Sequence, residues 1–187
     1  FVIYPAFLCL SALSVPLFDF LLTAKWHGAA PYFQIMLLSA LLVPLHRING
    51  NIIQVKNKAN WMLWLGLFES GSLMLVLLFS HTYGIQWILL GHLTATTFVY
   101  LVKSYFTKQL VRYSFLMQIT DVLPTLAIGI FAFGGVGLIA AMWQAPSYVK
   151  LFGLGSLGMF AYFSLAHLFS VGGYLLLRDL VHGGLRK

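Results

Sequence analysis

The sequence has 187 residues, of which 60% are hydrophobic and only 8% are charged. A soluble domain carries about 25% charged residues, so this chain lacks the side chains that would cover a water-exposed surface. Its net charge of +7 would suggest nucleic acid in a soluble protein. Here Lys and Arg lie between hydrophobic runs and form no basic face, so we expect no nucleic-acid partner. Cys9 is the only cysteine, which excludes a disulfide within the chain.

Apolar runs long enough to cross a bilayer follow one another along the whole chain. They are too long and too uniform for membrane-spanning strands, so we predict an all-α, polytopic transmembrane bundle of about six helices. The second run is short for a span, and we expect it to continue past a kink at Pro44 into Ile52 and Ile53. In chain order the runs cover residues 2–22, 32–45, 61–80, 85–102, 122–142 and 152–177.

Between the fourth and fifth runs, aromatic and apolar side chains alternate with basic and polar ones over residues 105–119. This pattern predicts a short amphipathic helix on the cytoplasmic interface. A lipid-headgroup or partner site is the functional alternative. We expect Asp121 to cap the fifth helix, with Pro124 in the first turn, where a missing N–H costs little.

The basic residues are distributed unevenly among the connections between runs. Three of the connections together hold only two basic residues, Lys25 and Lys150. We expect Lys25 to form an interfacial salt bridge with Asp19. By the positive-inside rule, the first helix then enters from the cytoplasm and the C-terminus is cytoplasmic. The other basic residues fall after the second run, after the fourth run and in the C-terminal tail: Arg47, Lys56, Lys58, Lys103, Lys108, Arg112, Arg178, Arg186 and Lys187.

Glu69 lies in the middle of the third run, where a charged side chain costs about 2.5–3.5 kcal/mol to insert. It shares a stripe with Gly66, Ser70 and Ser80, which we expect to face protein or a cavity. With no fixed positive charge nearby in sequence, Glu69 is expected to be partly protonated near neutral pH. Ion coupling or substrate contact is one interpretation, and a neutral, structural hydrogen bond across helices is the other.

Three further polar residues fall in the runs or beside them. His92, in the fourth run, is either a packed hydrogen-bonding group or a proton relay. His46 and Arg47 follow Pro44, where a kink can open a helix toward a cavity. Arg47 suits the recognition of a phosphate, or else it marks the cytoplasmic boundary. No catalytic or metal motif is present, so the candidates are substrate- or ion-binding residues: His46, Arg47, Glu69 and His92.

Four stretches carry a resemblance to a known family. They are LLTAKW at 21–26 with Ala30 and Pro31 after it, LVPL at 42–45 with INGNII at 48–53, HTYGI at 81–85, and residues 105–124 from YFT to DVLP. In this order they resemble the C-terminal part of bacterial polysaccharide flippases for O-antigen, capsule or exopolysaccharide, in the multidrug/oligosaccharidyl-lipid/polysaccharide exporter superfamily. Thr23 and Trp87 depart from the pattern, since the family tends to have glycine at both positions.

The resemblance implies a membrane transporter and not an enzyme. The chain would be a single transmembrane domain, 1–187, forming about six of the fourteen helices of a larger protein. Such proteins move an undecaprenyl-diphosphate-linked oligosaccharide across the cytoplasmic membrane by alternating access. Expected partners are the lipid bilayer, the lipid-linked oligosaccharide and the N-terminal half of the same transporter. No cofactor is expected beyond possible coupling to H⁺ or Na⁺.

Two other functions stay open. A multidrug cation antiporter of the same superfamily would want acidic groups in its cavity, whereas the chain has only four acidic residues and several basic connections, which favour the flippase. An intramembrane enzyme would need Glu69 and His92 to converge.

Overall fold

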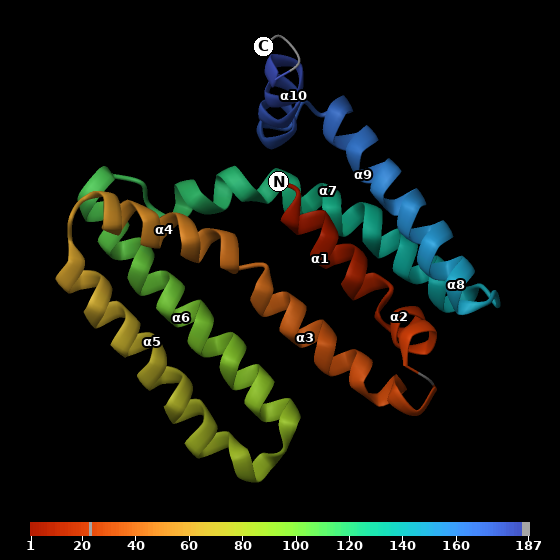
Figure 1. The fold of residues 1–187 in the computed structure, drawn as a ribbon, viewed down its shortest axis with the longest axis horizontal. Helices are drawn as coiled ribbons and strands as arrows, with labels where there is room; N and C mark the ends of the chain where they lie inside the picture. Colours follow the sequence, from red (N-terminus) through yellow and green to blue (C-terminus); the bar gives the residue numbers. More distant parts are fainter. Residues whose placement is uncertain (23, 185–187) are drawn as a thin grey trace. The chain divides into compact units, whose positions relative to one another are not determined.

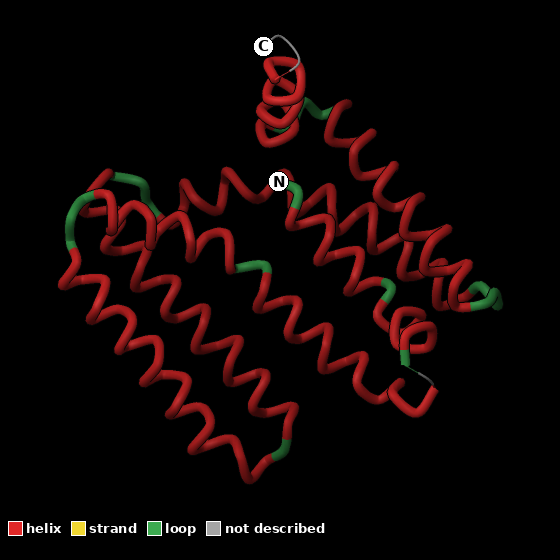
Figure 2. The backbone as a smooth tube through the Cα atoms, viewed as in Figure 1, coloured by secondary structure: helices red, strands yellow, loops and turns green. Residues whose placement is uncertain are grey.

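The computed structural model describes residues 1–22 and 24–184, which are helical almost throughout and contain no strand (Figures 1 and 2). The predicted all-α class is confirmed. The elements are α1 (Ile3–Ala12), α2 (Ser14–Leu21), η1 (Ala24–Ala29), α3 (Ala30–Ala40), α4 (Val43–Val55), α5 (Ala59–Ser80), η2 (His81–Tyr83), α6 (Ile85–Val111), α7 (Phe115–Met142), α8 (Ser147–Val149), the π-helical η3 (Lys150–Leu154), α9 (Gly155–Leu168) and α10 (Gly172–Gly184).

Helices long and apolar enough to cross a membrane make up most of the described residues. Five segments meet this description, and α1 with α2 makes a sixth if the pair is one span bent by 74°. Pro16 explains the bend, because its ring clashes with the carbonyl four residues earlier, at Ala12, where α1 ends. The prediction of about six membrane-spanning helices is confirmed. The five segments are Lys25–Val55, Ala59–Tyr83, Ile85–Val111, Phe115–Met142 and Ser147–Leu168.

The chain divides into two compact units. The first unit combines Phe1–Ala30 with Val122–Lys187, and the second unit is Pro31–Asp121. That residues 1–187 form one transmembrane domain, the C-terminal portion of a larger transporter, stays a prediction.

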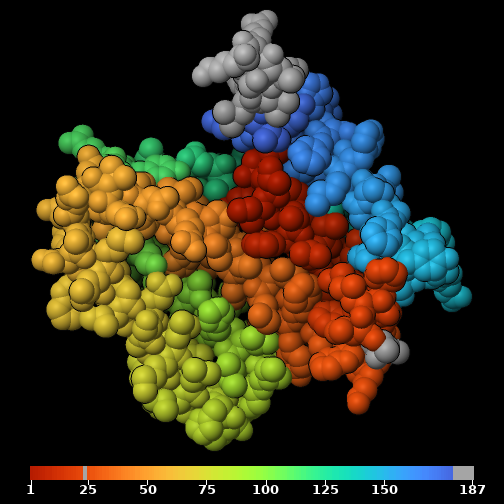
Figure 3. Space-filling model, viewed as in Figure 1, coloured from red at the N-terminus to blue at the C-terminus, as the bar shows by residue number. Residues whose placement is uncertain are grey.

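In the second unit, the kink predicted at Pro44 is present. Helix α3 ends at Ala40 and α4 begins at Val43 with Pro44 in its first turn. As at Pro16, the proline ring clashes with the carbonyl four residues earlier, so the helix cannot continue without a break. The side chains of α5 lie largely at the surface (yellow in Figure 3). Many of its exposed side chains are large and apolar, as expected for a face toward lipid, among them Leu63, Trp64, Met74 and Phe79.

The prediction of a separate amphipathic helix over 105–119 is wrong. Residues 105–111 continue α6, and α7 begins at Phe115 after a turn in which Arg112 has a φ of 60°. Helix α6 has 27 residues and is about 40 Å long, which exceeds the thickness of a hydrocarbon layer of about 30 Å, so its basic end needs no separate helix at the interface. Asp121 does not cap a helix, because it lies inside α7, where its carboxylate accepts a hydrogen bond of 2.6 Å from the Tyr113 hydroxyl.

The first unit has an apolar interior formed by α1, α7 and α9. Phe133 of α7 and Tyr162 of α9 are its largest fully buried side chains, with Phe1, Leu8 and Cys9 packed against them. This contact is close because Gly158 leaves room for the Phe133 ring.

Two predictions for the first unit are wrong. The last apolar run does not continue to residue 177: α9 ends at Leu168, and Ser170, with a φ of 48°, separates it from α10. The predicted pair of Asp19 with Lys25 is replaced by a contact of Asp19 with the His27 ring.

Candidate functional site

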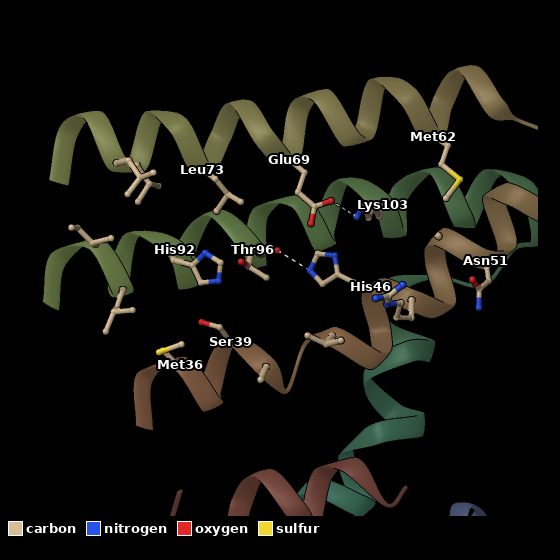
Figure 4. A pocket seen from close by; sticks show the side chains of 18 of the residues that line it. Met36, Ser39, His46, Asn51, Met62, Glu69, Leu73, His92, Thr96 and Lys103 are labelled. Carbon is tan, nitrogen blue, oxygen red and sulfur yellow. Dashed lines mark hydrogen bonds and ion pairs between the residues drawn. The ribbon is translucent and has the colours of Figure 1, made fainter. Parts of the chain in front are cut away.

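A pocket of about 880 Å³ lies in the second unit and is lined by α3, α4, α5 and α6 (Figure 4). It contains all four residues that the sequence singles out. His46 and Arg47 come from α4, Glu69 comes from α5 and His92 comes from α6. Their roles as binding residues stay predictions, but residues spread over 47 positions in the sequence line one cavity.

Helix α4 presents one face to this pocket and buries the other. The buried face carries Leu45, Asn49 and Ile53, which recur at the spacing of one side of a helix. Since α4 starts at the break before Pro44, the first turn after the break places its polar side chains in the cavity. The residues of α4 that line the pocket are Val43, His46, Arg47, Gly50, Asn51 and Gln54.

The face of α5 toward the pocket differs from the predicted polar stripe. Glu69 lines the cavity as predicted, but Gly66 and Ser70 are exposed. Glu69 is the only charged side chain that α5 contributes to the pocket. The other pocket residues of α5 are large and apolar: Met62, Leu73, Val76 and Leu77.

Glu69 has a fixed positive partner that its neighbours in the sequence do not reveal. The ammonium of Lys103 on α6 donates to Glu69 Oε2 at 2.6 Å (Figure 4). Glu69 is ten residues into α5 and Lys103 is eight residues from the end of α6, about 15 Å and 12 Å along the helices at 1.5 Å per residue. An ion pair at this depth satisfies two charges that would each be costly alone.

Lys103 is the functional candidate that the sequence interpretation missed. The fourth apolar run ends at Val102, so Lys103 reads as part of a cytoplasmic connection. Because α6 continues to Val111, Lys103 stands eleven residues after His92, only about 20° around the helix. If the fourth apolar run is read as a helix that continues past Lys103, the sequence alone places His92 and Lys103 on one face.

His46 connects α4 to α6. Its Nε2 donates to the backbone carbonyl of Thr96 at 3.2 Å, since a carbonyl can only accept. The ring also lies against Tyr100, with the ring centres 5.8 Å apart. Nδ1 of His46 is buried and has no hydrogen-bond partner among the described residues.

Arg47 is the exposed cation of the pocket. The two ion pairs found among the described residues join Asp19 to His27 and Glu69 to Lys103, so Arg47 has no carboxylate partner there. With neutral histidines, two fixed cations and one carboxylate give the pocket a net charge of +1. The arrangement can therefore accept an anion.

A buried polar network lies behind the pocket face of α4. The Asn49 amide donates to Gln118 Oε1 at 2.8 Å, and the Gln118 amide donates back to Asn49 Oδ1 at 3.0 Å. Gln118 also accepts from the Tyr100 hydroxyl at 3.1 Å and donates to Ser104 Oγ at 3.1 Å. These residues belong to α4, α6 and α7, so the network fixes the face that α4 turns toward the pocket.

Comparison with protein-family models, with curated protein sequences and with solved structures finds no match. Among the described residues, no group of three or more His, Cys, Asp or Glu side chains is placed to hold a metal ion. The interpretation of the site therefore depends on the positions and chemistry of the chain's own side chains.

Proposed function

We propose that this chain belongs to a transporter that moves an undecaprenyl-diphosphate-linked oligosaccharide across the bacterial cytoplasmic membrane, for cell-surface polysaccharide biosynthesis. The observation that carries the proposal is a pocket with an excess of positive charge within apolar, membrane-spanning helices. Charged side chains in such helices mark substrate and ion pathways, because they are otherwise costly. The transporter would work by alternating access together with its N-terminal half.

The size and chemistry of the pocket suit a phosphate-bearing headgroup. A volume of about 880 Å³ lies within the usual range of ligand sites, roughly 300–1,000 Å³. The guanidinium of Arg47 is exposed in it and can bind two phosphate oxygens in one plane. The resemblance of residues 21–26, 42–53, 81–85 and 105–124 to the flippases points to the same class of substrate.

A cation antiporter is the second candidate, because Glu69 places a carboxylate in the pocket. Its charge is offset by Lys103 at 2.6 Å, which makes the pocket less suited to organic cations. An intramembrane enzyme has less support, since the contact of Glu69 among the described residues is with Lys103 and not with His92.

Binding of defined ligands separates the two transporter candidates. The purified chain in detergent is titrated with undecaprenyl diphosphate, with undecaprenol and with an organic cation, and thermal unfolding is followed. We expect the diphosphate to raise the unfolding temperature and undecaprenol to have little effect, because the pocket recognises charge. Stabilisation by the organic cation alone would favour the antiporter and refute the flippase.

Arg47 provides a sharper test of the same function. Hydrogen bonds to charged groups contribute about 1.5–3 kcal/mol, so Arg47→Ala should weaken diphosphate binding at least about tenfold. Arg47→Lys should recover part of the loss, because it keeps the charge but not the planar pair of donors. Lys56→Ala, outside the pocket, is the matched control. Unchanged binding by Arg47→Ala would make Arg47 a marker of topology only.

Orientation in the membrane is a further prediction. We expect positions 56, 108 and 187 to face the cytoplasm; position 187 lies outside the described residues. Single cysteines at these positions, in a Cys9→Ser background, should be protected from an impermeant thiol reagent in intact cells and labelled after lysis. Labelling of position 56 or 108 from outside would contradict the predicted topology.

A further inference from the structure

We propose that Glu69 is a built-in competitor for the anion that this pocket binds: a diphosphate displaces the Glu69 carboxylate from Lys103, and Glu69 takes up a proton from solution as it is released. The choice of a diphosphate rests on the proposed function. The competition itself rests on the ion pair and on the charges that surround it.

The two partners of the ion pair are not equally buried. The side chain of Lys103 is 14% exposed, whereas that of Glu69 is 42% exposed. Glu69 is therefore the partner that can turn into the pocket, while the stem of Lys103 stays packed. An anion that enters the pocket reaches the ammonium by taking the place of the carboxylate.

Lys103 cannot be left without a counter-charge at low cost. Removing the carboxylate leaves the more buried ammonium without compensation, which is unfavourable, and Lys103 lies within the apolar helix α6. Release of Glu69 and arrival of the anion are therefore expected to occur together.

Protonation of Glu69 adjusts the charge of the pocket to the ligand. With Glu69 ionised, Arg47 and Lys103 leave a net charge of +1, and with Glu69 neutral the net charge is +2. An ionised Glu69 would also repel the incoming anion. Diphosphate affinity should therefore rise as the pH falls, and each diphosphate bound should carry a proton to Glu69.

Other groups in the pocket also respond to pH. His46 and Arg47 face it from α4, and His92 and Lys103 face it from α6; α3 contributes no titratable group. Protonation of either histidine would favour an anion in the same direction as protonation of Glu69. A pH dependence alone does not identify Glu69, so the test has to remove its charge without changing its shape.

Calorimetric titration of the full chain in detergent with inorganic pyrophosphate provides this test, at pH about 5.5 and about 8, on either side of the histidine range. Because the two histidines and pyrophosphate itself also titrate in this range, the informative quantity is the ratio of the affinities of Glu69→Gln and the wild type at each pH. Glu69→Gln should bind about tenfold more tightly than the wild type at the higher pH, and this advantage should shrink at the lower pH. Asp121→Asn removes the same charge outside the pocket and should behave as the wild type. In a protein that already carries Lys103→Met, adding Glu69→Gln should no longer make pyrophosphate bind more tightly.

A second measurement does not depend on the folding of a variant. The infrared difference spectrum of the wild type on addition of pyrophosphate should show a new protonated carboxyl band, and Asp121→Asn should keep this band. If the band is absent, or if Glu69→Gln binds no more tightly than the wild type at either pH, the competition is refuted.

The lipid-borne and free forms of the ligand are distinguished by repeating the titration with undecaprenyl diphosphate in mixed micelles. Tighter binding of the lipid form to Glu69→Gln than to the wild type would support both proposals. Competition seen with pyrophosphate but no binding of the lipid would refute the flippase and keep the competition. Binding of the lipid with equal affinity in both proteins would refute the competition and keep the flippase.

Discussion

The two units hold their helices together by different chemistry. In the first unit, the buried side chains among the described residues are almost all apolar, and the buried polar ones there are the hydroxyl-bearing Ser14 and Thr125. In the second unit, two amide side chains, Asn49 and Gln118, are completely buried and bonded to each other. Both units consist of apolar helices, so composition alone does not separate them.

The difference matters because packing and hydrogen bonding restrict helices in different ways. In lipid, small residues let helices approach closely, and the contact depends on shape. A pair of amides that donate and accept mutually has one register and one orientation, since any other leaves polar groups unsatisfied. The second unit contains the charged pocket, and its directional network fixes the helices that line it.

The largest loss of stability is expected from breaking this hydrogen-bond network. Gln118→Leu removes both bonds between the amides. The Asn49 amide nitrogen keeps its bond to the Leu45 carbonyl at 2.9 Å, but buried Asn49 Oδ1 loses its donor, as the Tyr100 hydroxyl and Ser104 lose their bonds to Gln118, and an unsatisfied buried group costs about 1–3 kcal/mol. We expect a loss of about 3 kcal/mol in the free energy of unfolding in detergent, measured by denaturant titration. Gln109→Leu, an exposed glutamine on α6, should change it by less than about 0.5 kcal/mol.

A double variant sharpens this prediction. When both partners of a buried bond become apolar, the cost can be close to neutral. Asn49→Leu combined with Gln118→Leu should therefore be less destabilised than the sum of the two single variants. Simple additivity would show that the amides act independently and would contradict the role given to the network.

A smaller effect is expected from the apolar packing of the first unit. A Cβ at Gly158 would lie 2.7 Å from Phe133 Cε1 and 3.0 Å from Val136 Cγ2, and both side chains are buried. Overpacking of this kind costs about 1–3 kcal/mol, so Gly158→Ala should lower the unfolding temperature. Gly134→Ala, with nothing within 4 Å of its Cβ, should be neutral or stabilising. Equal behaviour of the two variants would mean that α7 and α9 do not pack as described.

The smallest loss of stability is expected from breaking the ion pair, in which the side chain of Lys103 is more buried than that of Glu69. Glu69→Gln leaves the more buried Lys103 without its counter-charge and should cost about 1 kcal/mol. Lys103→Met leaves a carboxylate that is 42% exposed, as in a surface pair, and should cost less. The unfolding temperatures of the two variants show which of them loses more stability. A greater loss for Lys103→Met would show that Glu69, and not Lys103, is the partner that depends on the pair.

The sequence by itself determined the helical class, the number of membrane-crossing segments and the break at Pro44. These follow from local physics, since the length of an apolar run and the missing N–H of proline act without distant partners. It also identified His46, Arg47, Glu69 and His92, because polar groups stand out in an apolar run. Helix ends are less well determined by sequence, because the charge at Lys103 suggests an end of α6 and Asp121 suggests a start of α7, whereas α6 continues to Val111 and α7 begins at Phe115.

Only the tertiary structure decided which of these residues share a site and with what partners. The contact of Lys103 with Glu69 joins residues 34 positions apart, and the bond of Asn49 to Gln118 joins residues 69 positions apart. Neither follows from periodicity, which gives the face of a helix but not the neighbour that it meets. The partner of a buried charge depends on how helices pack, and this packing makes Glu69 one half of an ion pair in a cationic pocket.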